Sequence, residues 1–449
     1  MLIRFIITLT LIHHVTAIVS GHDFPGFRGV NGWGVAPDQP IPLTWSQTEN
    51  VAWKAELPGA GWSQPVIIGD RLFVTAAVSE KDLQPKNFAE GVKSPQSMGI
   101  SFLSKSPDVV IDWTVSCLSV TDGRVLWTRS VHSAKPLYPI HPSNSFATET
   151  PVADADGVYV HFGAAGVVAG FSHTGDELWK QEVGVRKTSN SFGTGSSLAI
   201  ADGHVFLQDL SEESANVICY AAKTGQVVWK AAREKNSTSW SSPVIWKNAQ
   251  REELIVSGDQ LVESFDPATG NLLWKVGRVK AATACSPCAD AERLYFGGSD
   301  PFSKGPLFAV TAGGSGDLSP EKSNAEFSGN AWKQDRAGPG MASPVSNGQF
   351  LYVVDKNILR CYRAATGEQL YQNRLPGIDM VAASPLIIGN KLLIIDENGS
   401  GCIVEIGETF NVIGSGTIAE TVWATPAVSA GAIFVRGGKS VYCLRAVKE

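Results

Sequence analysis

The hydrophobic and polar positions of this chain repeat in short blocks. A block opens at a Ser-Pro or Thr-Pro step and continues through an apolar strand, a polar turn and a second apolar strand, such as Leu72-Phe73-Val74 or Leu351-Tyr352-Val353. Short alternating apolar runs between turn residues are typical of antiparallel sheets. Pro is tolerated where a strand begins, because no hydrogen-bond donor is lost inside the sheet. The pattern therefore predicts a series of small antiparallel sheets.

The opening step recurs along most of the chain, once without its Pro. Its copies are Gln64-Pro65, Thr150-Pro151, Ser196-Ser197, Ser242-Pro243, Ser286-Pro287, Ser343-Pro344, Ser384-Pro385 and Thr425-Pro426. Repeats of roughly forty residues are the signature of a propeller or a solenoid. Four strands fit into each unit, and four-stranded sheets repeated around an axis are propeller blades.

A second repeated signal is Gly-x-x-x-Trp, which ends each unit. Its copies run from Gly123 to Trp127, Gly175 to Trp179, Gly225 to Trp229 and Gly270 to Trp274, with a weaker copy from Gly367 to Tyr371. The Gly supplies a turn conformation that other residues resist. The aromatic residue is expected to pack against the neighbouring sheet.

The two ends of the chain complement each other. The last unit lacks a Gly-x-x-x-Trp strand, whereas Asn50-Val51-Ala52-Trp53-Lys54 is such a strand with no unit before it. We predict that residues 51–56 complete the eighth blade and close the ring, which also removes two exposed strand edges. The predicted fold is all-β: one eight-bladed β-propeller of four-stranded antiparallel blades, spanning residues 21–449.

Two units are longer than the others. Residues 79–112 are expected to form an insertion between the second and third strands of blade 1, and residues 312–330 a shorter one between the third and fourth strands of blade 5. Loops of this length are usually functional or disordered.

Charge and composition narrow the function classes. The net charge is −6 and no basic run occurs, which argues against nucleic-acid binding. Arg4, the apolar run of residues 5–12 and Val15-Thr16-Ala17 resemble a secretory signal peptide, assigned to residues 1–20. No later apolar run is long enough to span a membrane. We therefore expect a soluble protein of the periplasm or the extracellular space.

The seven Cys follow the repeat rather than a disulfide framework. Cys117, Cys219 and Cys361 each lie six residues before the turn Gly of their unit. Equivalent positions on different sheets are expected to be too far apart for a disulfide. Cys285 and Cys288 are close in sequence, but neither a helix start nor a second CxxC accompanies them. All seven are predicted to be structural thiols.

At the level of motifs, the units resemble the PQQ-like, BamB-like propeller repeat of quinoprotein type. The shared pattern is written here as Asp266-Pro267-Ala268-Thr269-Gly270 followed by Trp274. The resemblance covers about residues 25–449. Phe27-Arg28-Gly29 with Gly32-Trp33-Gly34, and the stretch of residues 140–151, look like an exported bacterial subgroup.

This resemblance implies either an enzyme or a scaffold, because the repeat serves both. Quinoprotein dehydrogenases hold pyrroloquinoline quinone (PQQ) with calcium and commonly carry two adjacent Cys. No two Cys are adjacent in this chain, and no acidic calcium loop occurs. We therefore predict no catalytic residue, no metal site and no cofactor, with PQQ and calcium as the alternative.

Any ligand site should lie in the axial funnel, where the loops that enter each first strand gather. Candidate residues are His141, Asn144, Glu149, Asn190, Ser191, Trp240, Ser241 and Arg336. Polar groups with one aromatic suit a small polar or saccharide-like ligand. The competing interpretation is that these side chains bind loop backbone or buried water.

The favoured function is a non-catalytic scaffold that binds envelope or secreted proteins, or a small ligand in the funnel. The alternative is an enzyme: a PQQ-dependent oxidoreductase, or a hydrolase that uses funnel carboxylates.

Overall fold

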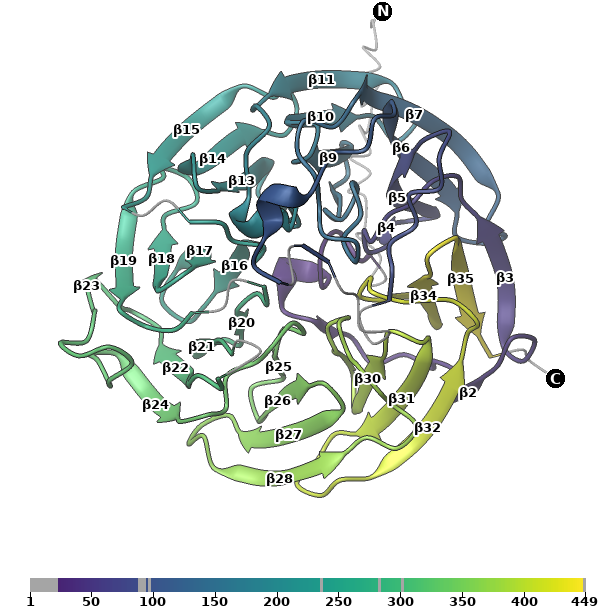
Figure 1. Ribbon diagram of the computed structural model, residues 1–449. Helices are drawn as coiled ribbons and strands as arrows, with labels where there is room; N and C mark the ends of the chain where they lie inside the picture. Colours follow the sequence, from purple (N-terminus) through teal and green to yellow (C-terminus); the bar gives the residue numbers. More distant parts are fainter. Residues whose placement is uncertain are drawn as a thin grey trace, which may run out of the picture.

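The computed structural model describes residues 23–87, 94–95, 98–234, 237–281, 284–299 and 303–446. The proposed signal peptide, residues 1–20, lies outside these ranges. Eight sheets are arranged around a central axis like the blades of a propeller (Figure 1). The predicted fold class is therefore confirmed. Among the described residues, no helix has the length and apolar character needed to cross a membrane.

Within blades 1 to 7 the four blade strands follow the chain from the axis to the rim, whereas the rim strand of blade 8 comes from the N-terminal part of the chain. Blades 1 to 4 consist of β4 (Val66–Ile68), β5 (Arg71–Val78), β6 (Ile111–Ser119) and β7 (Val125–Ala134); β8 (Val152–Ala153), β9 (Val158–Phe162), β10 (Val167–Phe171) and β11 (Glu177–Glu182); β12 (Ala199–Ala201), β13 (His204–Leu210), β14 (Ala215–Ala221) and β15 (Val227–Ala232); and β16 (Val244–Lys247), β17 (Glu252–Gly258), β18 (Leu261–Phe265) and β19 (Leu272–Gly277).

Blades 5 to 8 complete the ring. They consist of β20 (Cys288–Ala289), β21 (Arg293–Gly297), β22 (Leu307–Thr311) and β24 (Asn330–Gln334); β25 (Val345–Ser346), β26 (Phe350–Asp355), β27 (Ile358–Arg363) and β28 (Gln369–Arg374); β29 (Leu386–Ile388), β30 (Lys391–Ile395), β31 (Ser400–Glu405) and β32 (Val412–Thr417); and β33 (Ala427–Ser429), β34 (Ala432–Arg436), β35 (Ser440–Arg445) and β3 (Val51–Glu56).

The ring is closed by β3, which pairs with β35 in antiparallel register. Trp53 lies opposite Cys443, and its indole Nε1 donates a hydrogen bond to the Val120 carbonyl of blade 1 at 3.0 Å. The first and last parts of the chain are thus joined in one sheet, as the sequence predicts.

Each repeated Trp ties its blade to the turn of the next blade. Trp179 Nε1 donates to the Ala222 carbonyl at 2.6 Å, and a Cβ on Gly225 would lie only 2.4 Å from the Trp179 ring. Trp274 is an exception, because its Nε1 donates to Glu253 Oε2 within its own blade. The segment after β22 in blade 5 does not form the usual tight turn there.

Two blades have additional strands at their edges. Residues 312–329 separate β22 from β24 and contain β23 (Gly316–Asp317), which pairs in parallel with β19 of blade 4. In blade 7, β2 (Thr44–Trp45) pairs in parallel with β32, while β1 (Val35–Ala36) pairs with the inner strand β29. These blades therefore exceed the four strands expected.

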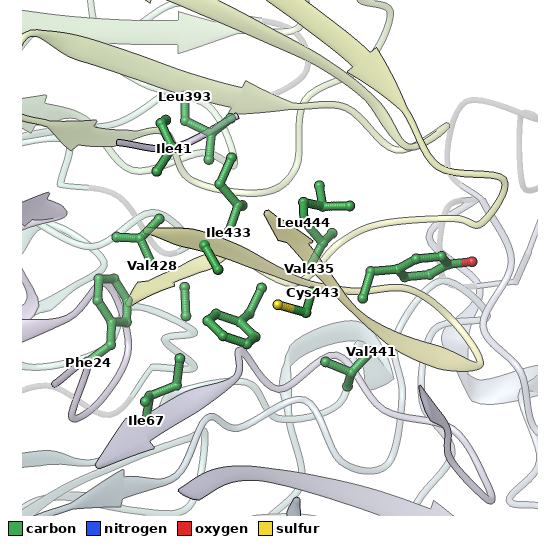
Figure 2. Packing of buried hydrophobic residues seen from close by; sticks show 14 of the residues in the cluster. Phe24, Ile41, Ile67, Leu393, Val428, Ile433, Val435, Val441, Cys443 and Leu444 are labelled. Carbon is green, nitrogen blue, oxygen red and sulfur yellow. The ribbon is translucent and has the colours of Figure 1, made fainter. Parts of the chain in front are cut away.

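The hydrophobic core lies between the blades. One cluster joins blades 7, 8 and 1, and Phe24 and Ile41 of the N-terminal segment pack into it beside Val428 and Ile433 (Figure 2). All seven Cys are free and buried, as predicted. Burial raises the pKa of Cys117 to about 12, so this thiol is a poor nucleophile at neutral pH.

Candidate functional site

The loops that enter the inner strands are joined by a belt of hydrogen bonds around the axis. At each step, the backbone N–H of one blade donates to the hydroxyl of the next. The pairs run from Gln64 to Thr150, Thr150 to Ser197, Ser197 to Ser242, Ser242 to Ser286, Ser286 to Ser343, Ser343 to Ser384 and Ser384 to Thr425, at 2.8 to 3.1 Å. The Ser or Thr before each Pro therefore has a structural role.

Blade 1 departs from the belt, because Gln64 takes the place of the Ser or Thr. Its amide binds the N-terminal segment: Nε2 donates to the Gly26 carbonyl and Oε1 accepts from the Arg28 N–H. The Arg28 side chain is fully buried and donates to the carbonyls of Trp33, Pro287 and Pro344. These contacts join blades 1, 5 and 6, so the Phe27-Arg28-Gly29 stretch is a structural link across the axis.

The residues one position before the belt differ between the two halves of the ring. They are Ser63, Glu149, Ser196 and Ser241 in blades 1 to 4, and Cys285, Ala342, Ala383 and Ala424 in blades 5 to 8; all eight are buried. The polar half also contains His161, Gln208 and Ser257 at the ends of the second strands. The candidate site is therefore this polar half, which we call the polar arc.

Glu149 is the carboxylate of the polar arc. Only 1% of the residue is exposed, Oε1 accepts the Gly163 N–H at 3.2 Å, and Oε2 has no hydrogen-bond partner among the described residues. Ser241 Oγ and Gln208 Oε1 also lack partners there. Buried polar atoms without partners are rare in native proteins and often indicate a missing ligand or water.

His141 and Asn144 support the loop before blade 2. His141 stacks on Phe192 at 5.0 Å between ring centroids, and its Nδ1 lies 2.7 Å from Ser143 Oγ. Burial lowers the pKa of His141 to about 4, which keeps the ring neutral at pH 7. Asn144 Nδ2 donates to the Phe192 and Thr194 carbonyls at 2.7 and 3.1 Å. Both side chains are used to hold loop backbone.

The remaining sequence candidates are dispersed. Trp240 Nε1 donates to the Gly193 carbonyl at 2.6 Å, and its ring meets Phe192 edge-on. Asn190 and Ser191 have left-handed backbone conformations in η3 (Ser189–Ser191), where Asn190 is exposed. Arg336 is exposed before blade 6. The structure thus places Glu149 and Ser241 in the polar arc and the other six candidates outside it.

Sequence reasoning missed Arg436, the last residue of β34. It is 2% exposed, and its Nη1 donates to Ser63 Oγ and to the Thr75 carbonyl, each at 2.5 Å. Burial lowers the pKa of Arg436 to about 9. The sequence signal that could have identified Arg436 is its position directly after the apolar residues 433–435, where a charged side chain is expected to be buried with its strand.

The segment between β5 and β6, residues 79–110, is called the blade 1 insertion, and its described residues partly cover the mouth of the ring. Asn87 Nδ2 donates to Asn398 Oδ1 of blade 7 at 2.9 Å, and the Lys86 N–H donates to the Pro142 carbonyl at 2.8 Å. Its short helix η2 (Ser101–Leu103) contacts η3 of the loop before blade 3 and lies close to the centre of the ring in Figure 1.

Two other hollows differ in character. A cavity of about 30 Å³, enough for a water or two, borders the polar arc at His161, Ser196 and Gln208. A groove of about 480 Å³ lies between β3 and the start of the blade 1 insertion and is lined by both signs of charge, among them Lys54, Lys81 and Glu420.

The described part of the chain offers few side chains that could bind the metal ion of a metal-bound cofactor. No group of three or more His, Cys, Asp or Glu side chains is placed to hold a metal ion there. Cys285 and Cys288 lie beside Arg28, where burial raises the pKa of each thiol to about 12. These residues do not offer the acidic oxygen ligands that a calcium-bound quinone needs.

Comparisons with solved structures show the same fold at low identity. BamB from Moraxella catarrhalis is 12% identical with a TM-score of 0.55, covering 88% of this chain and 97% of that one. Quinohemoprotein alcohol dehydrogenase from Comamonas testosteroni is 10% identical with a TM-score of 0.61, covering 95% of this chain and 81% of that one. The computationally designed Ika8 protein is 10% identical with a TM-score of 0.54, covering 88% and 99%.

The sequence itself matches a family model. No individual curated protein gives a significant match. The model described as outer membrane protein assembly factor BamB matches residues 43–193 and 164–318, which together are more than half of the chain. The repeated blades, the Trp ties between them and this match lead to one conclusion: the protein belongs to the BamB family of PQQ-like β-propellers.

Proposed function

We propose that this protein is an exported, non-catalytic platform that docks a protein partner on the blade 1 insertion. The family description, outer membrane protein assembly factor, supports a partner among the proteins of the cell envelope. Large exposed apolar side chains on the insertion are the observation that carries this proposal.

These side chains are Met98, Phe102 and Leu103, with Phe102 being 80% exposed. Leu137, also exposed, follows Pro136, whose carbonyl accepts a hydrogen bond from Ser106 of the insertion at 2.6 Å. Clustered apolar groups in water are unfavourable in a monomer and typically mark interaction sites. Phe and Met are enriched at interfaces, and aromatic side chains that become buried there, such as Phe102, serve as anchors for a partner.

The insertion is held in place on the mouth face at several points. It is tied to blade 7 by Asn87 and to the loop before blade 2 by Lys86 and Ser106. These ties hold described residues on both sides of the apolar side chains, so less conformational entropy is lost when a partner covers them.

The test compares two double variants for retention of envelope proteins by the immobilised full chain. F102S/L103S removes the apolar groups of the insertion, whereas V227S/V228S removes two exposed apolar groups of β15 on the rim. We expect F102S/L103S to weaken binding of the retained partner at least about tenfold, as loss of interface anchors does. V227S/V228S should bind like the unaltered protein.

Thermal melts of both variants establish that they are folded. Equal binding by F102S/L103S and the unaltered protein would contradict the proposal. So would a selective loss in V227S/V228S, which would move the docking surface to the rim.

A further inference from the structure

Five cationic side chains gather between blades 5 and 6, at the end of these blades that faces the mouth of the ring. They are Lys304 in the loop after β21, Arg336 in the loop after β24, Lys356 in the turn after β26, Arg360 in β27 and Arg374 at the end of β28. We call them the blade 5/6 cation cluster. The whole chain has a net charge of −6, so this local excess of positive charge does not follow from the composition.

The backbone brings the loops of the cluster together. The Gly338 N–H donates to the Gly305 carbonyl at 2.8 Å, which places the loop after β24 beside the residue that follows Lys304. Lys304 Nζ in turn donates to Asp355 Oδ2, and Asp355 directly precedes Lys356. The three loops that carry the exposed members of the cluster therefore meet.

The pleat of blade 6 directs the other two cations to the same side. Arg360 lies opposite Val353, and Val353 packs in one hydrophobic cluster with Trp332 of blade 5. Residues opposite one another on paired strands have their side chains on one face of the sheet, so Arg360 faces blade 5. Arg374 lies opposite Ile358, two positions before Arg360 and therefore on that same face.

Most of this positive charge has no anionic partner in the described part of the chain. Of the five cations, only Lys304 forms an ion pair there, with Asp355. Arg360 is 9% exposed, its Nε donates to the neutral amide of Gln372 at 2.8 Å, and its Nη1 has no hydrogen-bond partner among the described residues. A buried charge is costly unless it is paired, so an anion held beside Arg360 is favoured.

The cations are close enough to repel one another. Burial, and after it the like charges of Arg360, Lys356 and Arg336, lower the pKa of Lys304 below its usual value. An anion shared by these side chains would relieve the repulsion.

An anion can reach the cluster directly from solvent. Arg336 and Lys356 are exposed, and the side chain of Lys304 is 36% exposed, so binding requires no internal cavity. Asp335, which precedes Arg336 in the sequence, pairs with Lys333 at 2.8 Å and leaves Arg336 available.

We infer that the blade 5/6 cation cluster binds a doubly charged oxyanion, a phosphate or sulfate group. Lys304, Arg336 and Lys356 contact the anion, and the buried Arg360 adds positive charge from the interface between the blades. Hydrogen bonds between cationic side chains and a phosphate are about twice as strong as neutral ones. Because the Coulomb energy grows with the charge of the ligand, several cations around one point favour a divalent anion over chloride or a single carboxylate.

The inference is independent of the docking proposal. Blades 5 and 6 lie across the ring from the strands of blade 1 (Figure 1), and the cluster shares no residue with the blade 1 insertion. Failure of the anion site therefore leaves the docking proposal standing, and the reverse is also true.

Titration calorimetry with the full chain tests the inference. The probes are inorganic phosphate, glycerol phosphate and sulfate, with chloride and acetate as singly charged anions, all at pH 8 and equal ionic strength. We expect at least one divalent oxyanion to bind about tenfold or more tighter than either singly charged anion. Tighter binding of glycerol phosphate than of inorganic phosphate would identify a phosphate ester as the ligand, and the reverse order would identify the free anion.

The double variant R336Q/K356Q removes two exposed cations of the cluster and leaves the core intact. We expect it to weaken oxyanion binding at least about tenfold, because hydrogen bonds to charged groups are lost. R124Q/K223Q is the matched control: it removes two cations whose side chains are each 75% exposed, on blades 1 and 3, and should bind normally. Thermal melts establish that both variants are folded.

Two results with the unaltered protein would overturn the inference. In the first, no divalent oxyanion binds. In the second, chloride or acetate binds as tightly as the best oxyanion, which would show a general effect of salt. Unchanged affinity in R336Q/K356Q, or an equal loss in both double variants, would refute the assignment of the site to this cluster.

Discussion

Removing the Trp53 side chain should destabilise the whole ring. Trp53 is 9% exposed, its Nε1 bonds the Val120 carbonyl at 3.0 Å, and its ring lies 5.9 Å from that of Phe434. Roughly 200 Å² of apolar surface at about 25 cal/mol per Å², less what Ala retains, gives about 3 kcal/mol. The lost hydrogen bond adds about 1 kcal/mol. We therefore expect Trp53→Ala to cost about 4 kcal/mol.

Calorimetry provides the assay. The unfolding entropy of a chain of this length is roughly 0.9 kcal/mol per kelvin, so 4 kcal/mol corresponds to a fall in melting temperature of about 4–5 °C. Trp229→Ala is the matched control, because Trp229 makes the same tie to Pro267 at 2.9 Å but lies between blades that are joined by the chain. Trp53→Ala should lose at least as much as this control. A melting temperature within 1 °C of the unaltered protein would refute the closure of the ring by β3.

Three further predictions concern the turns, the buried imidazole and the thiols. Gly225→Ala should lower the free energy of unfolding in denaturant by about 3 kcal/mol, because its Cβ would meet the Trp179 ring at 2.4 Å. The control Gly203→Ala has a similar positive φ but open space around its Cβ, and should lower the free energy of unfolding by only about 1 kcal/mol. Equal losses in the two variants would contradict the packing of Trp179 on the Gly225 turn. The pKa of His141 is lowered to about 4 in the folded chain, so protons bind the unfolded state preferentially and stability should fall as pH falls from about 6.5 to about 4. His141→Gln should reduce that dependence, and an identical pH profile would exclude His141 as its source. Ellman's reagent at pH 8 should label no thiol in the native protein and seven in guanidinium, because all seven are buried. Rapid native labelling would show that the blades open.

The fold was predictable from sequence because it depends on local signals. The Gly of each Gly-x-x-x-Trp turn has a positive φ, and every repeated Trp except Trp274 packs on the turn of the next blade, so the repeat encodes its own assembly. The orphan strand around Trp53 indicated closure for the same reason. By contrast, β2 and β23 pair with rim strands of blades to which they are not adjacent in sequence, and no local sequence pattern predicts such pairing.

The candidate site was less predictable, because it is formed by residues that lie far apart in the sequence. Glu149 and Ser241 were identified from their places before the first strands, and both lie in the polar arc. Nothing local distinguishes them from His141, which binds Ser143 of its own loop, or from Asn144, which donates to the loop before blade 3. Arg436 is followed by two glycines and resembles an ordinary surface residue at a strand end. Only the approach of Gly61 and Thr75, more than 350 positions away, reveals its burial.

Photo-crosslinking from the blade 1 insertion tests the proposed docking function most directly. A photoreactive phenylalanine analogue is placed at position 102 on the insertion or at position 228 on the rim, and intact cells are irradiated. The docking proposal predicts a discrete crosslinked partner from position 102 and none from position 228. A partner captured only from position 228, or no adduct from position 102, would contradict it.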